Sequence, residues 1–421
     1  MKAGWQTEKL GEVCSLLNRG ISPKYIEASG ICVLNQKCIR ENRVSYEQAR
    51  RHDLAAKSVC VSRFIQLGDV LVNSTGTGTL GRVAQVRDAP EEPTTVDSHV
   101  TIVRPKQGKF YQDFFGYMLI LIEEAIKEAG EGCGGQTELS RSVLAEKFSV
   151  SYPTSVAEQQ RIVAILDQAF EGIAKARANA QQNLQNARAL FESHLQSVFS
   201  VRGELVEPQH PSTSSGRADK GRANNNLVAL SDLAIDITDG DHMPPPKAIT
   251  GVPFITIGNI VKHTRTIDFT DTFKVPFEYF NKLKANKKPK RGDVLYTVTG
   301  SFGIPVLVKD NQEFCFQRHI GLIRPKSDVS SEWLCYLLGS PQLVKQANDG
   351  ATGTAQKTVS LKVLRGFQVP NLPIDKQNKM VVELDALSKE TQRLEALYQR
   401  KITLLDELKK SLLQQAFAGE L

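Results

Sequence analysis

Two long stretches of the chain place apolar residues at helical spacing. Between Ile162 and Val198 the apolar positions recur at three- and four-residue steps, with no proline and a single glycine. Residues 375–421 repeat this spacing. Such steps predict long helices with a coiled-coil-like seam. The predicted seam residues are Ile162, Leu166, Ile173, Leu184, Phe191 and Leu195 in the first helix, and Leu387, Leu394, Tyr398, Leu405, Leu408 and Leu412 in the second.

Both predicted helices begin with a start signal. Ser155 and Glu158 have the spacing of a capping box, and Asp375 is a suitable N-cap. The first seam is rich in alanine in its middle, whereas the second carries leucine and tyrosine, so small side chains can face large ones. We expect the helices to pair antiparallel as a rod of roughly 60 Å with a globular domain at each end. The alternative is that each helix simply caps a domain.

The remaining sequence alternates short apolar segments with Gly, Pro and Asn, which is typical of strands and turns. Residues 100–105 and 320–325 read as strands that end at proline, and residues 113–129 and 331–347 read as helices. Each globular part is therefore predicted to be of mixed α+β type.

These patterns occur twice, at an offset near 220 residues. The motif GDVL stands at 68–71 and at 292–295, and SHVTIVRPK at 98–106 matches RHIGLIRPK at 318–326. The helix starts EQQRIVAILD and KQNKMVVELD also correspond. We infer that one unit, a globular part followed by a helix, has been duplicated. The predicted organisation is a first domain at 1–154, a helix at 155–206, a flexible linker at 207–226, a second domain at 227–374 and a helix at 375–421.

Composition narrows the class of protein. Hydrophobic residues make up 41% and charged residues 24%, as in soluble globular proteins. No apolar run is long enough to cross a membrane and the start lacks a secretory signal, so we expect a cytoplasmic location. The seven cysteines are odd in number and form no CxxC pair, which favours idle thiols over a zinc site or a disulfide framework. The net charge is +7, and residues 227–373 carry +5 of it, with 18 basic and 13 acidic residues.

Each apparent catalytic motif in the sequence lacks part of the context that its chemistry requires. Residues 76–81 match GxGxxG, but a strand-like segment follows where a dinucleotide fold needs a helix, so we interpret them as a hairpin tip. Residues 243–246 lack the aromatic residue of an amino-methyltransferase loop, and Glu407 to Lys409 lies in a charged helix face. His99 and His319 each stand alone in a strand, which favours a structural role. The chain is therefore predicted not to be an enzyme.

The repeated plan, the helix starts and the C-terminal sequence LLDELKKSLLQQAFAGEL resemble the specificity subunit of type I restriction-modification enzymes. The resemblance covers nearly the whole chain. It implies two target-recognition domains that each read one half of a split, asymmetric sequence in double-stranded DNA. It also implies that the paired helices set the gap between the halves and dock two methyltransferase subunits. Cofactors are expected on partner subunits only: S-adenosylmethionine on the methyltransferases, and ATP with Mg²⁺ on separate motor-nuclease subunits.

Candidate DNA contacts are polar and basic residues expected on loops. The run from Lys284 to Arg291 is the strongest, because it holds five cations in eight residues directly before a strand. Two alternatives stay open: a reader from another restriction type, and a scaffold that binds no DNA. The candidates are Gln36, Lys37, Arg40, Arg43, Asn73, Ser74, Thr75, Thr77 and Arg82 in the first domain, and Lys262, His263, Arg265, Lys284, Lys287, Lys288, Lys290, Arg291, Thr299 and Ser301 in the second.

Overall fold

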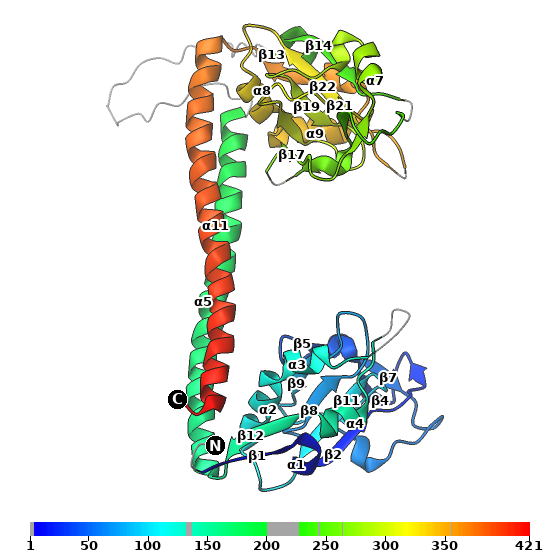
Figure 1. Cartoon of the computed structure of the whole chain (residues 1–421), viewed down its shortest axis with the longest axis vertical. Helices are drawn as coiled ribbons and strands as arrows, with labels where there is room; N and C mark the ends of the chain where they lie inside the picture. Colours follow the sequence, from blue (N-terminus) through cyan, green and yellow to red (C-terminus); the bar gives the residue numbers. More distant parts are fainter. Residues whose placement is uncertain (1–3, 132–136, 200–226, 243–244, 263, 355) are drawn as a thin grey trace, which may run out of the picture. The chain divides into compact units, whose positions relative to one another are not determined.

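A computed structural model describes residues 4–131, 137–199, 227–242, 245–262, 264–354 and 356–421. The chain forms two compact units. Unit 1 consists of residues 1–181 together with 400–421, and unit 2 of residues 182–399. Each unit therefore contains one globular domain and a portion of both long helices (Figure 1). The linker predicted at 207–226 lies outside the described residues.

The central sheet of unit 1 is antiparallel, with the strand order β2-β11-β8-β9. Helix α2 (Gln112–Leu121) contacts β8 and β9 and buries two phenylalanines in the core. The sheet strands alternate little, because residues on both faces are covered. The strands are β2 (Cys14–Arg19), β11 (Val100–Pro105), β8 (Val70–Asn73) and β9 (Val83–Gln85).

A second sheet of unit 1 has the order β10-β4-β7-β3, and β10 runs parallel to β4. A two-stranded sheet joins β1 to β12, and a short hairpin joins β5 to β6. These strands are β3 (Tyr25–Ile26), β4 (Ile31–Leu34), β7 (Arg50–His52), β10 (Thr94–Val96), β1 (Trp5–Lys9), β12 (Ser149–Pro153), β5 (Ile39–Arg40) and β6 (Arg43–Val44). The short helices are α1 (Leu10–Val13), η1 (Gln36–Cys38), η2 (Val61–Arg63), α3 (Glu123–Glu128) and α4 (Arg141–Glu146).

Unit 2 repeats this plan, which confirms the duplication read from the sequence. Its central sheet has the order β14-β22-β19-β20, its second sheet the order β18-β15-β21 with β21 parallel to β15, and β13 pairs with β23. The strands are β13 (Leu227–Ala229), β14 (Ala234–Asp239), β15 (Val252–Ile255), β16 (Ile260–Val261), β17 (Thr266–Ile267), β18 (Phe273–Val275), β19 (Val294–Thr297), β20 (Pro305–Leu307), β21 (Cys315–Phe316), β22 (Ile320–Pro325) and β23 (Gln368–Pro370). The short helices are α6 (Leu230–Leu233), η3 (Ile257–Asn259), α7 (Phe277–Lys282), η4 (Ala285–Lys287), α8 (Ser331–Leu338), α9 (Pro341–Gly350) and α10 (Leu361–Arg365).

A buried ion pair explains two of the repeated motifs. In unit 1 the Asp69 carboxylate of GDVL accepts two hydrogen bonds of 2.7 Å from Arg104, the arginine of the RPK motif. In unit 2 Asp293 accepts bonds of 2.9 and 2.7 Å from Arg324. Both carboxylates are almost fully buried, at 1% and 3% side-chain exposure. Each bidentate pair ties the strand that follows GDVL to the neighbouring strand of the central sheet.

The long helices are α5 (Val156–Phe199) and α11 (Ile374–Ala418), and a buried glutamine fixes the start of each. The side chain of Gln159 accepts a bond from the Tyr111 amide at 2.7 Å and donates to the Pro153 carbonyl at 2.9 Å. Gln377 does the same with the Ser330 amide and the Leu372 carbonyl. The repeated glutamine of the two helix starts therefore satisfies backbone groups at the join between domain and helix.

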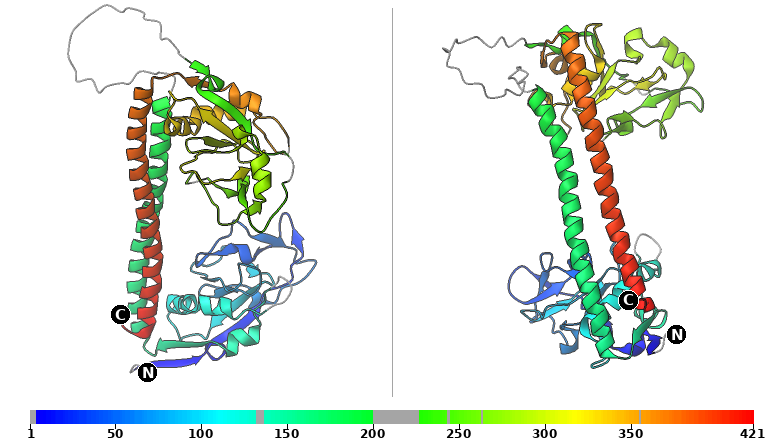
Figure 2. Two further views of the ribbon diagram at one scale, coloured as in Figure 1. Left: turned by 45° about the horizontal axis from the view of Figure 1, so that its top comes forward. Right: turned by 90° about the vertical axis from the view of Figure 1, so that its left-hand side faces the viewer.

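The helices run antiparallel within each unit, as predicted (Figure 2). In unit 1, Arg161 donates to the carbonyl of Leu421 and Arg177 pairs with Asp406 at 3.0 Å. In unit 2, Arg188 pairs with Glu395 at 2.9 Å. The C-terminal end of α11 buries two residues in the core of unit 1, and the C-terminal end of α5 does so in unit 2: Leu413, Phe417, Leu195 and Phe199. Each domain thus packs against the end of the helix from the other half, which goes beyond simple capping.

The predicted seam is buried to different depths. Ile162, Leu166, Ile173 and Leu195 are buried, and the half-buried members are Leu184, Phe191, Leu387, Leu394, Tyr398, Leu405 and Leu412. Leu408 departs from the prediction because it is 46% exposed. The neighbouring Lys409 turns inward instead and lies over the Phe170 ring of α5 at 5.2 Å. Packing against the domain, and not the apolar spacing alone, therefore decides which of the two residues faces inward.

The described residues contain neither a helix suited to a membrane nor a cluster suited to a metal ion. None of the helices in the described ranges is long and apolar enough to cross a membrane. The same part of the chain contains no group of three or more His, Cys, Asp or Glu side chains that could hold a metal ion.

Candidate nucleic-acid interface

The glycine-rich segment of unit 1 is the turn between two antiparallel strands. Strand β8 pairs with β9 on either side of it, which confirms the hairpin interpretation. Gly76, Gly78 and Gly81 have φ values of +105°, +77° and +78°, a region that favours glycine. A Cβ on Gly81 would also meet the backbone of Lys127 at 2.8 Å. The glycines therefore shape a tight tip, and the nucleotide-binding reading of GxGxxG has no support.

Three polar side chains tie this tip to the turn η1. The Thr79 hydroxyl donates to the Gln36 side-chain oxygen at 2.7 Å. The amide of Asn73 donates to the carbonyls of Gln36 at 3.0 Å and of Thr79 at 3.1 Å. The Asn73 side-chain oxygen is buried and has no hydrogen-bond partner among the described residues. Asn73 therefore orders the tip from inside.

The base of the tip is held by a second set of bonds. The hydroxyls of Ser74 and Thr101 lie 2.5 Å apart in the interior, and the Thr75 hydroxyl lies 2.7 Å from the His99 ring. The buried Asp97 carboxylate accepts the His99 amide at 2.9 Å. Burial raises the pKa of Asp97, and the bond from His99 acts against this rise. His99 thus has protein partners, as its predicted structural role requires.

The hairpin of β5 and β6 carries two of the cations predicted to contact DNA in unit 1. Its two turn residues, Glu41 and Asn42, have φ values of 53° and 59°, which is typical of a two-residue hairpin turn. Arg40 and Arg43 flank the turn directly and both are exposed. The hairpin therefore presents two guanidinium groups on a short, defined support.

The predicted contact residues of unit 1 fall into three groups by exposure. Lys37, Arg40, Arg43 and Thr77 are exposed, Gln36, Thr75 and Arg82 are half-buried, and Asn73 and Ser74 are buried. The Arg82 guanidinium donates to the Gly78 carbonyl at 3.0 Å. The exposed and half-buried groups can reach a ligand, whereas the buried pair can act only by shaping the tip.

In unit 2 the lysine run divides into bound and free cations. Lys287 donates to the Gly240 carbonyl at 2.9 Å, and Lys288 donates to the Asn281 carbonyl at 3.1 Å. Lys284, Lys290 and Arg291 are exposed, and their side-chain cations make no hydrogen bond or ion pair with another described residue. The run therefore offers three uncommitted charges just before β19.

The other candidates of unit 2 occupy different environments. Lys262 is exposed, and His263 lies outside the described residues. Arg265 has a φ of 52°. Its guanidinium packs against Gly339 so closely that a Cβ added to Gly339 would lie 2.4 Å from the nearest guanidinium nitrogen. Because Gly339 is the C-cap of α8, a cation there is stabilised by the end of the helix. Thr299 is buried at 8% exposure and Ser301 is exposed.

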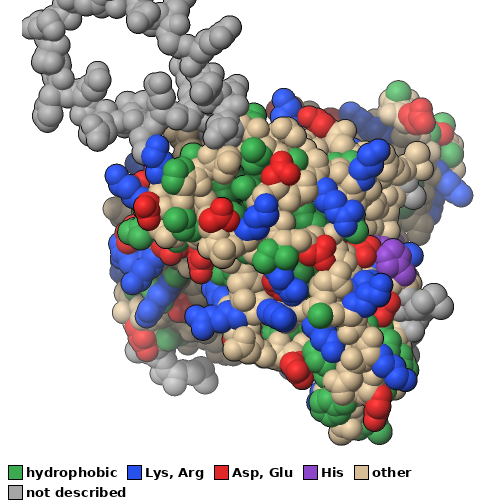
Figure 3. All heavy atoms as spheres, turned by 90° about the horizontal axis from the view of Figure 1, so that it is seen from above, with side chains coloured by type: hydrophobic (Ala, Val, Ile, Leu, Met, Phe, Trp, Pro, Cys, Tyr) green, Lys and Arg blue, Asp and Glu red, His purple; other side chains and the backbone are tan. Residues whose placement is uncertain are grey.

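The charge on one face of the protein is mixed. On the face shown in Figure 3, Lys and Arg side chains lie among acidic and apolar ones and do not merge into one field. Burial, with a smaller effect of the neighbouring Arg318, lowers the pKa of His319, so this ring is neutral at neutral pH. On this face, attraction to a polyanion would come from local groups of cations.

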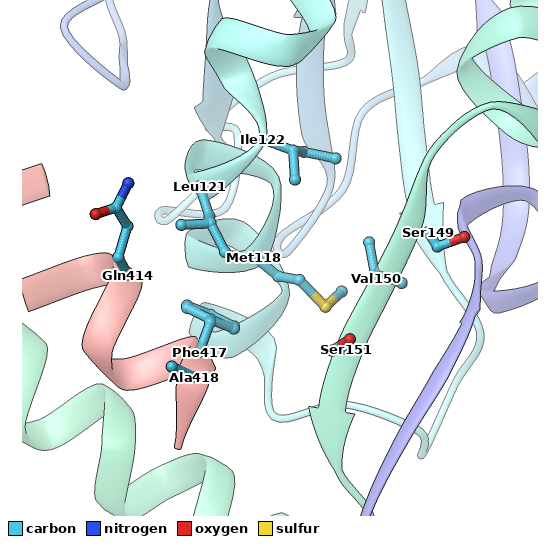
Figure 4. Close-up of a pocket in the computed structure, with 9 residues that line it drawn as sticks. All are labelled: Met118, Leu121, Ile122, Ser149, Val150, Ser151, Gln414, Phe417 and Ala418. Atoms are coloured by element: carbon cyan, nitrogen blue, oxygen red, sulfur yellow. The ribbon is translucent and has the colours of Figure 1, made fainter. Parts of the chain in front are cut away.

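Unit 1 also contains a cavity of about 260 Å³ between α2, β12 and the end of α11. Figure 4 shows Met118, Val150 and Phe417 around it. Its lining holds no ionisable side chain. The cavity offers no acid or base beside its two serines, Ser149 and Ser151.

Sequence reasoning missed the polar residues that join strands and helices within each unit, which we call the frame. The Asp–Arg pairs, the buried glutamines and the tyrosine bonds to the helices were not predicted. Tyr117 donates to Asp167 in unit 1, and Tyr336 donates to Asp385 at 2.6 Å in unit 2. All of these residues recur between the two halves at offsets of 218 to 224. Comparison of the halves for repeated polar positions, rather than for apolar ones, was the signal that could have found them.

Comparisons with known proteins agree with this two-fold plan. A family model described as the type I restriction modification DNA specificity domain matches residues 2–183 and 240–404. The chain is 25% identical over 343 residues to the specificity subunit of the type I restriction enzyme EcoBI of Escherichia coli, which covers 78% of this chain and 70% of that protein.

Two solved structures share the fold at 18% identity. One comes from work on complex assembly and conformational transition of the type I R-M system, with a TM-score of 0.76 over 100% of this chain and 99% of the other. The second is the HsdS subunit from Thermoanaerobacter tengcongensis, with a TM-score of 0.56 over 100% and 98%.

Proposed function

Because the chain belongs to the type I restriction modification DNA specificity domain family, we propose that it reads DNA sequence within a type I restriction-modification complex and performs no catalysis itself. One observation carries the proposal. The two units share a frame braced by the same Asp–Arg pair, yet they expose different side chains on it. A common frame with different displayed residues is what a two-part reader of unlike half-sites needs.

Each unit would read one half of a bipartite, asymmetric site. Cations such as Lys37, Lys284 and Arg291 would bind phosphates, which gives affinity and register but no sequence information. Hydrogen-bonding side chains, among them Gln36, Thr77 and Ser301, would meet base edges in a groove. Because the two sets of residues differ, the halves of the site should differ as well.

The long helices α5 and α11 would form the docking site for the partner subunits. Two methyltransferase subunits would dock on the helix pair, bind S-adenosylmethionine and methylate adenine within the site. Motor-nuclease subunits would use ATP and Mg²⁺ to cut unmodified DNA. We further infer that the complex acts in the cytoplasm, where the DNA to be modified and cleaved is found.

A methylome tests this function. The chain is produced together with the methyltransferase of the same restriction-modification system, in a host that lacks DNA methylation, and N6-methyladenine is mapped by single-molecule sequencing. We expect one split, asymmetric motif that disappears when this chain is omitted. Methylation that does not depend on the chain, or none from a stable complex, would contradict the proposed function.

A further inference from the structure

A network of polar side chains joins the β5–β6 hairpin to helix α11 within unit 1. The Asn42 amide donates to the Glu123 carboxylate at 2.6 Å and to the Val83 carbonyl at 3.2 Å. On its other side, Asn42 accepts a bond of 3.4 Å from the ammonium of Lys409. Asn42 thus sits between α3, β9 and α11, and its side-chain groups have partners on both sides.

Both ends of this network are fixed. Glu123 is 17% exposed and also forms an ion pair of 3.0 Å with Lys127 one turn further along α3. Lys409 is half-buried against Phe170. Burial lowers the pKa of Lys409, and the charges of Glu123 and Asp406 act against that change. Asn42 and Glu123 therefore hold the Lys409 ammonium in this half-buried position.

The described residues of the second half show no such arrangement. At the offset of 218 that aligns the two helix starts, Lys409 corresponds to Phe191, an aromatic seam residue that packs near Tyr336. The hairpin β16–β17 is instead held by Arg265 against Gly339. The network is therefore not part of the shared frame. Among the described residues it occurs in unit 1, at the place where apolar spacing would have turned Leu408 inward.

We propose that Asn42, Glu123 and Lys409 form a latch that positions the β5–β6 hairpin for DNA reading, which makes them positioning residues for the sequence specificity of unit 1. The inference rests on the proposed function. Asn42, the latched residue of the turn, and its neighbour Glu41 stand directly between Arg40 and Arg43, so any movement of the turn moves both guanidinium groups. Base readout needs side chains placed to a fraction of a hydrogen-bond length, whereas phosphate attraction tolerates displacement.

The test repeats the methylome with latch variants in the intact complex. N42G keeps the left-handed turn, because glycine adopts it freely, but removes the side chain. K409M keeps the length and apolar stem of the lysine and removes the ammonium group. E123Q retains an oxygen that can accept the Asn42 bond. The matched controls are E41G, which places glycine at the adjacent position of the same turn, and K410M, which removes the next, exposed charge of α11.

We expect N42G and K409M to relax one half of the motif only, with selectivity at the affected base pairs reduced on the order of 10-fold. E123Q, E41G and K410M should keep the wild-type motif. If N42G and K409M give the same motif and methylated fraction as their controls, or if both halves weaken equally, the latch has no role in positioning. A wild-type chain that directs no methylation would overturn the proposed function, and this inference with it.

Discussion

Replacing Arg104 with methionine should destabilise unit 1 by about 3–5 kcal/mol, because it leaves the buried Asp69 carboxylate without its counter-charge. The carboxylate is 1% exposed and would keep the 2.8 Å bond from the backbone amide of Gln66. The effect should appear in hydrogen exchange of the amides in β8 and β11, measured on the full chain. The equivalent change of Arg324 should act on β19 and β22 of unit 2.

Two companion variants separate this explanation from a general loss of packing. R51M removes one partner of an exposed ion pair with Glu92 and should cost no more than about 1 kcal/mol. The double variant D69N/R104M removes the stranded charge, so it should be more stable than R104M alone. A double variant that is no more stable than R104M would mean that lost packing, and not the unpaired carboxylate, dominates.

Neutralising the free cations of the lysine run should weaken binding to every DNA sequence alike. In K284Q/K290Q/R291Q we expect the slope of log K against log salt to fall by roughly 3, because each phosphate contact contributes about 1. Affinity at 0.1 M salt should drop on the order of 100-fold. Anisotropy titrations of the complex at several salt concentrations, with one duplex that contains the mapped motif and one that does not, would measure both quantities.

The control for this experiment removes the same charge elsewhere in unit 2. K309Q/K345Q/K362Q changes three exposed lysines outside the run. If both triple variants lower the slope equally, net charge and not the run attracts the DNA. If neither changes it, the run makes no phosphate contacts.

The periodic and repeated features of this protein could be predicted from its sequence. Helices α5 and α11 follow apolar residues at three- and four-residue steps, a local pattern that needs no partner to be recognised. The duplication shows because the same motifs return in the same order. The two-domain α+β fold with an antiparallel helix pair, and the family to which the chain belongs, followed from these features and are confirmed.

The candidate site was harder to predict than the fold. Polar residues on predicted loops were taken as contacts, but Asn73 and Ser74 are buried below the glycine-rich tip, and Arg265 packs against Gly339. Within the lysine run, sequence alone treats five cations as equal, whereas two of them bind carbonyl groups. Exposure and hydrogen bonding depend on which distant segments of the chain pack together. The sequence of one loop does not contain that information.

By itself, then, the sequence determined the repeat, the two long helices and the absence of a catalytic motif, because these rest on order and spacing along the chain. The tertiary structure alone decided that the end of α11 completes unit 1, that Asp69 meets Arg104, and that Lys409 rather than Leu408 turns inward to Asn42. Asn42 and Lys409 stand 367 positions apart. Side chains so far apart in sequence are brought together only by the packing of the core between them, and that packing decides which polar groups must find partners.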